Sequence, residues 1–146
     1  MATYEELKST VMVEQHASQE WAKATLAWGD AATIWEAAVR KTPSLSEVRA
    51  RWASAGRSWM SVALAWAPRS DESWLPGNYL WTSWSCYWAD VAHRWAIESL
   101  NSAVDAGRYP LLALYSLPSA DSAVDLASAA VVWAKPQSIS ERACGG

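Results

Sequence analysis

Phenylalanine is absent from this chain of 146 residues, which contains only two cysteines, six prolines and six glycines. Cys86 and Cys144 lie far apart and belong to no CxxC pair or Cys/His cluster, so neither a disulfide scaffold nor a zinc site is predicted. Because prolines and glycines are few, long stretches of the chain are free of the residues that interrupt helices.

Charge is also scarce. Charged residues make up 18% of the chain and hydrophobic residues 51%, against about 25% charged residues in an average soluble protein. So apolar a composition excludes a disordered chain. Alanine and serine take the place of many of the missing charged residues, which favours close helix packing and a self-association surface.

The pattern of charge and hydropathy excludes several partners. The net charge of −3 argues against nonspecific binding to nucleic acid or to anionic membranes. The basic stretch from Arg40 to Arg57 lacks the alternating aromatics and glycines of common RNA-binding modules, so we expect a solvated face there. No apolar run is long enough to span a membrane, and the charged N-terminus does not resemble a secretory signal. We therefore expect a cytoplasmic or intravirion protein that is not secreted.

Capping-box spacings mark the expected helix starts, because a Ser or Thr followed three residues later by Glu satisfies backbone amides reciprocally. The boxes Thr3–Glu6 and Ser44–Glu47 predict helices over residues 3–41 and 44–66. A proline follows each helix and disfavours helical geometry in the residue before it. These two helices are expected to form a hairpin with a tight turn.

Two further helices are expected. Residues 70–77 suggest a connector, and a third helix should then run to about Ala106, where Gly107 can take a left-handed cap conformation. The apolar run 111–117 fits either a helical turn or an extended segment. The spacing Ser122–Asp125 marks the start of a last helix that ends by Lys135.

No strand-like alternation of useful length occurs in the sequence. Four helices with short connections most simply fold as an all-α, antiparallel four-helix bundle, with two long N-terminal helices, a long third helix and a shorter C-terminal one. We assign residues 1–136 to this single domain and residues 137–146 to a flexible C-terminal tail.

Tryptophan is the unusual feature of the sequence. Residues spaced by seven lie along one seam of a helix, and in the first two helices alanine or valine generally follows each tryptophan after three positions. A ring on one helix can then fill the space opposite a small residue on its neighbour. Nine of the twelve tryptophans follow the seven-residue spacing in three predicted helices: Trp21, Trp28, Trp35, Trp52, Trp59, Trp66, Trp81, Trp88 and Trp95.

So many rings exceed what a core of this size needs, unless tryptophan simply replaces phenylalanine. The excess is densest in the third helix, where Trp84 stands three residues after Trp81 in the place that other helices give to a small residue. Aromatic walls suit a flat hydrophobic or cationic ligand, and interface hot spots have the same composition. The candidate binding residues are Trp81, Trp84, Tyr87, Trp88, Asp90, His93 and Trp95.

Catalytic patterns are weak. His16 with Glu20 and His93 with Asp90 have spacings that can bring a carboxylate to an imidazole on one helical face, but no nucleophile elbow, phosphate loop or dinucleotide fingerprint occurs. We predict no catalytic residue, no metal site and no cofactor.

The sequence therefore favours a non-catalytic helical protein that forms a homo-oligomer or binds a protein partner through tryptophan- and alanine-rich faces. The alternative is a small-molecule-binding protein with a tryptophan-lined pocket near Trp84, and a third hypothesis is a small enzyme using His93 or His16.

Overall fold

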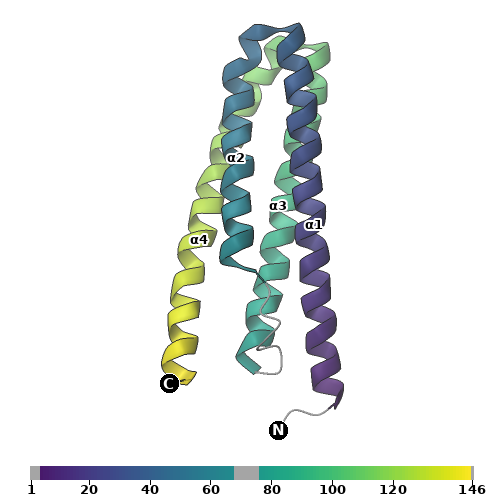
Figure 1. The fold of residues 1–146 in the computed structure, drawn as a ribbon. Helices are drawn as coiled ribbons and strands as arrows, with labels where there is room; N and C mark the ends of the chain where they lie inside the picture. The colour runs from purple at the N-terminus through teal and green to yellow at the C-terminus, as the bar shows by residue number, and fades with distance from the viewer. Residues whose placement is uncertain (1–3, 68–75, 146) are drawn as a thin grey trace.

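The fold is described from a computed structural model that covers the backbone of residues 4–67 and 76–145 and the side chains of residues 16–67 and 81–134. Helices joined by short 3-10 turns make up these segments, which contain no strand. In chain order the elements are α1 (Tyr4–Lys41), η1 (Pro43–Leu45), α2 (Ser46–Ala65), α3 (Pro76–Arg108), η3 (Pro110–Ser116) and α4 (Leu117–Gly145). Consecutive helices run in opposite directions, so η1 and η3 lie together at one end (Figure 1). The predicted antiparallel four-helix bundle is confirmed.

The closest packing joins helices that are not consecutive. α1 makes its most extensive contact with α3, and α2 with α4. Within each of these pairs the helices point the same way (Figure 1). The chain thus consists of two helical hairpins laid side by side, and each helix of one hairpin packs against its counterpart in the other.

Hydrogen bonds from indole groups fix the register of α1 against α3. Trp21 Nε1 donates to Ser85 Oγ at 2.9 Å, and Trp35 Nε1 donates to Ser99 Oγ at 3.1 Å. Both bonds join residues 64 positions apart, as parallel helices in constant register require. Trp28 lies midway between Trp21 and Trp35, so the same offset of 64 residues places it level with Ala92 of α3.

Each layer of this seam combines one large and one small side chain. The register places Trp28 level with Ala92, and the tryptophans of α3 alternate with those of α1, so that Trp88 is level with Ala24. These side chains are buried. A ring opposite a methyl group lets two helices approach closely without leaving a void, which explains the tryptophan spacing by core packing.

The same offset of 64 residues relates α2 to the last part of the chain. Trp52 Nε1 donates to Ser116 Oγ at 3.1 Å, and Trp66 Nε1 donates to the carbonyl of Ala130 at 2.9 Å. The rings of α2 cover a face of α4 where, over residues 117–134, every buried side chain is small: Ala120, Ala123, Ala127, Ala130 and Ala134. This half of the core therefore takes its volume from α2.

The turn between α1 and α2 differs from the predicted capping box. No side-chain cap forms at Thr42 or Leu45, the residues before η1 and α2. Instead the amide of Leu45 donates to the carbonyl of Thr42 at 3.0 Å, and Ser46 Oγ donates to the carbonyl of Pro43 at 2.7 Å. The predicted capping box of Ser44 and Glu47 was wrong because residues 43–45 form a 3-10 turn, which makes Leu45 the residue before α2.

The boundary between α3 and α4 also differs from the prediction. Gly107 is helical and has no positive φ, so it is not the expected left-handed cap. Tyr109 ends α3 with an extended backbone (φ −134°, ψ 79°), the geometry favoured before a proline. The apolar run 111–117 fitted either a helical turn or an extended segment, and all of it except Leu117 lies in the 3-10 turn η3.

The last helix is longer than predicted at both ends. α4 begins at Leu117, so Ser122 lies inside the helix and the Ser122–Asp125 capping box was wrong. The helix also continues beyond Lys135 to Gly145. The separation of residues 137–146 from the domain stays a prediction. Of the connector predicted over residues 70–77, residues 70–75 lie outside the described segments.

Candidate functional site

The predicted binding residues of α3 do not share one environment. Trp81 and Trp88 are buried in the core, with 5% and 8% of their surfaces exposed, and Trp95 is half-buried against it. These rings supply core volume. By contrast, Trp84 and Tyr87 are exposed by 39% and 52%.

Trp84 lies outside the seam because the small residue in α3 follows each tryptophan by four positions. Ser85, fully buried, occupies the place that the sequence pattern had suggested for Trp84. The Trp84 ring packs instead edge-on against Trp133 of α4, with ring centroids 4.3 Å apart, and against Tyr87 at 5.5 Å. The α1–α3 seam therefore does not have to accommodate the Trp84 ring.

The two predicted histidine–carboxylate pairs do not form. Glu20 pairs with Lys23 at 3.0 Å, and Asp90 pairs with Arg94 at 2.8 Å. Within the segments that the structure describes, His, Cys, Asp and Glu side chains form no group of three or more that would hold a metal ion.

Ser85 connects three helices at the end of α2. Its hydroxyl accepts a hydrogen bond from Trp21 Nε1 and donates a hydrogen bond to the carbonyl of Trp66. Trp81 Nε1 donates to the carbonyl of Ala67 at 3.0 Å. The last carbonyls of a helix have no partner within it, so side chains of α3 cap α2 here.

Three buried indole nitrogens in the described core have no hydrogen-bond acceptor: those of Trp28, Trp59 and Trp88. The register places each of them level with an alanine, whereas the indoles level with a serine are bonded. A serine 64 positions away thus supplies a side-chain acceptor for the indole, whereas Trp66, level with Ala130, bonds to a backbone carbonyl instead.

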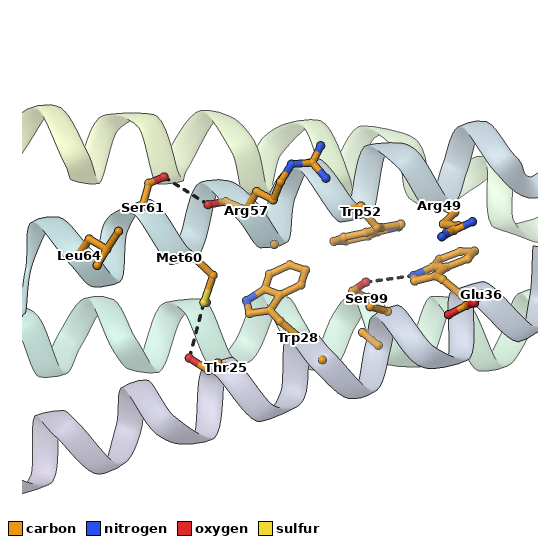
Figure 2. Close-up of a pocket in the computed structure, with 16 residues that line it drawn as sticks. Thr25, Trp28, Glu36, Arg49, Trp52, Arg57, Met60, Ser61, Leu64 and Ser99 are labelled. Atoms are coloured by element: carbon orange, nitrogen blue, oxygen red, sulfur yellow. Dashed lines mark hydrogen bonds between the residues drawn. The ribbon is translucent and has the colours of Figure 1, made fainter.

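A cavity of about 510 Å³ lies between α1 and α2 (Figure 2). Trp28 and Trp52 enter it from the two helices, with ring centroids 6.4 Å apart, and Ser99 of α3 lies at its floor. We call this cavity the α1–α2 groove. It shares no residue with the predicted binding set, and its other lining residues are Thr25, Gly29, Ala31, Ala32, Trp35, Glu36, Arg49, Ala53, Gly56, Arg57, Met60, Ser61 and Leu64.

Glycine opens the α1–α2 groove. A Cβ atom added at Gly56 would lie 3.2 Å from Cε3 of Trp28, so the absence of a side chain lets this ring lie against α2. A Cβ atom added at Gly29 would meet nothing within 4 Å. Glycine inside a helix costs about 1 kcal/mol relative to alanine, and at Gly56 the close approach of Trp28 gives the glycine a structural role.

A second surface stands out at the end of the bundle. The turn η3 and the residue before it expose five large apolar or aromatic side chains, and in η3 only Ala113 is buried. We call this surface the apolar tip, and it consists of Tyr109, Leu111, Leu112, Leu114 and Tyr115.

The thiol of Cys86, next to the Ser85 site, has an altered acidity. Its pKa is raised above the usual value, first by burial and then by the negative charges of Glu20 and Asp90. Each of these disfavours the thiolate.

Because only the thiolate reacts quickly with alkylating reagents, Cys86 should be less reactive in the folded protein than in the unfolded chain. In a Cys144→Ser background, we expect the alkylation rate to reach its half-maximum at a higher pH in buffer than in urea. The variant Glu20→Gln should lower that pH. An equal or lower midpoint in the folded protein would contradict this assignment.

The α1–α2 groove and the apolar tip were not found from the sequence, although signals for both exist. Gly29 and Gly56 stand inside predicted helices without a cap or turn to explain them. The apolar run of η3 was noted, but the sequence does not show which side chains of a short turn face the core.

No helix within the described segments has the length and hydropathy to cross a membrane. Comparison of the chain with protein-family models, with curated proteins and with solved structures finds no match.

Proposed function

We propose that this protein is a non-catalytic association module that forms a homo-oligomer through its apolar tip. The tryptophan and alanine faces that first suggested association are used inside the bundle, where they form the core. The apolar tip, by contrast, exposes five large apolar or aromatic side chains within seven consecutive residues. Leu111 and Tyr115, each 80% exposed, are the observation that carries the proposal.

The composition of the apolar tip supports burial against another chain. No charged residue occurs from Tyr109 to Ala120, so a partner can cover this surface without desolvating a charge. Burying each large apolar side chain contributes about 1.5–3 kcal/mol. Tyrosine is also enriched at interface hot spots. A two-fold contact between copies would bury the same surface on both chains.

Replacing Leu111 and Leu114 together by serine should abolish self-association, because both contribute exposed apolar area to the tip. We expect sedimentation velocity to show a concentration-dependent oligomer for the unaltered protein and a monomer for the double variant. The control is Leu26→Ser, at a 70% exposed position on α1 away from the tip, which should associate normally. A monomer of the unaltered protein at about 100 μM, a concentration well above common micromolar dissociation constants, would refute the proposal.

A further inference from the structure

The α1–α2 groove has the size and lining of a ligand site. Its volume of about 510 Å³ falls within the range of roughly 300–1,000 Å³ usual for small-molecule pockets, which combine apolar walls with a few polar groups. The rings of Trp28 and Trp52, tilted by 43° to each other, form the base of the groove with only 7% and 1% of their surfaces exposed, and Leu64 adds an exposed apolar wall from α2 (Figure 2). Met60 extends this wall, with its Sδ atom 3.6 Å from the hydroxyl of Thr25.

The charges around the α1–α2 groove are unbalanced. Arg49 and Arg57 both line it from α2, on either side of Trp52 (Figure 2), and neither forms an ion pair with any residue in the described segments. The nearby carboxylate of Glu36 is already paired with Arg40 at 2.9 Å. The groove therefore offers two cations without carboxylate partners beside an apolar wall.

The third arginine of α2, Arg51, is neutralised by ion pairs. Arg51 lies on the opposite side of α2, where it bonds both carboxylate oxygens of Asp121 at 2.9 and 2.7 Å and contacts Glu47 at 3.6 Å. On α2, the arginines without an ion pair are thus the ones that line the groove.

We propose that the α1–α2 groove binds a flat, apolar small molecule carrying one negatively charged group such as a carboxylate or sulfonate. The apolar part of the ligand lies over Leu64, Met60 and the exposed part of Trp28, and its anionic group lies beside Arg57 or Arg49. Arg49 and Arg57 are eight residues apart, about 12 Å along the helix, so the ligand can use either cation according to its orientation. This site is separate from the apolar tip and does not depend on self-association.

The test compares two dyes with the same ring system. One is 8-anilinonaphthalene-1-sulfonate, and the other is N-phenyl-1-naphthylamine, which lacks the sulfonate. Both are titrated by fluorescence against the full-length Leu111→Ser/Leu114→Ser protein, so that the apolar tip offers no competing site. We expect the anionic dye to bind about three- to fivefold more tightly, a preference typical of exposed ion pairs. Replacing Arg49 and Arg57 together by glutamine should remove this preference and leave binding of the neutral dye unchanged.

A second variant tests the location of the site. Gly29→Leu places a side chain where the structure has open space, so it should fill the groove without strain and weaken both dyes at least tenfold. Gly107→Leu is the matched control, because Gly107 is also helical with nothing within 4 Å and does not line the groove. Helical content measured by circular dichroism checks that both variants fold.

Two results would overturn the proposal. If Gly29→Leu binds the anionic dye as tightly as Gly107→Leu does, the groove is not the binding site. If the two dyes bind equally well, or if the arginine replacements do not change their ratio, the site does not select an anionic ligand.

Discussion

Replacing Trp59 by alanine is expected to lower the free energy of unfolding by about 3–5 kcal/mol, the usual cost of removing a large buried aromatic side chain. Trp59 has no exposed surface, and its ring lies 6.4 Å from that of Trp88 across the bundle. The facing position on α4 is Ala123, whose methyl group cannot fill the space that the indole leaves. Since domains of this size are stable by only about 5–15 kcal/mol, much of the total would be lost. Urea denaturation followed by circular dichroism at 222 nm, where the helical backbone dominates the signal, measures the change.

Trp84→Ala is the matched control for Trp59→Ala. The Trp84 ring is 39% exposed and packs edge-on against its neighbours outside the seam. Aromatic contacts of this kind contribute about 0.5–1.5 kcal/mol each beyond area burial, so we expect a loss of about 1–2 kcal/mol. Equal losses for the two variants would show that the seam is not the main source of stability.

Ser85→Ala should have the second largest effect, although it removes a single oxygen atom. The hydroxyl accepts a hydrogen bond from Trp21 Nε1 and donates a hydrogen bond to the carbonyl of Trp66. The substitution therefore leaves two buried groups without partners, and each such group costs about 1–3 kcal/mol. We expect a loss of about 2–5 kcal/mol in the same denaturation experiment.

Ser99→Ala and Ala92→Ser set the scale for this effect. Ser99 accepts the hydrogen bond from Trp35 Nε1. Ser99→Ala therefore leaves one indole nitrogen without an acceptor and should lower the free energy of unfolding by about half as much as Ser85→Ala. Ala92→Ser adds an acceptor at the level of Trp28, whose indole nitrogen has none, and should stabilise the protein by up to about 1 kcal/mol. If Ser85→Ala proved no more harmful than Ser99→Ala, the link to α2 would contribute nothing.

The sequence predicted the four helices and their buried seams because heptad spacing reports directly which face of a helix is covered. It did not predict which helices would pair, since a heptad in one helix says nothing about the identity of its neighbour. The information was present in a comparison between helices: every heptad tryptophan of α1 and α2 has a serine or alanine 64 positions later. These small residues are Ser85, Ala92, Ser99, Ser116, Ala123 and Ala130.

The candidate sites were harder to predict for two physical reasons. Trp84 was assigned to the seam because the small residue follows each tryptophan of α1 by three positions, whereas α3 uses a spacing of four so that its rings alternate with those of α1. The α1–α2 groove depends on how far apart two helices lie. That distance results from the stronger packing of α1 on α3 and of α2 on α4, which the pattern within one helix does not contain.

The offset of 64 residues also bears on how fast the chain folds. Folding rates fall as the sequence separation between contacting residues grows, because more chain must be ordered before a contact forms. In most small bundles the main contacts join consecutive helices across short turns, and such proteins fold within microseconds to milliseconds. Here the bonds from Trp21, Trp35, Trp52 and Trp66 all span 64 residues. Docking of the two hairpins, rather than closure of either turn, should therefore limit the folding rate of this protein.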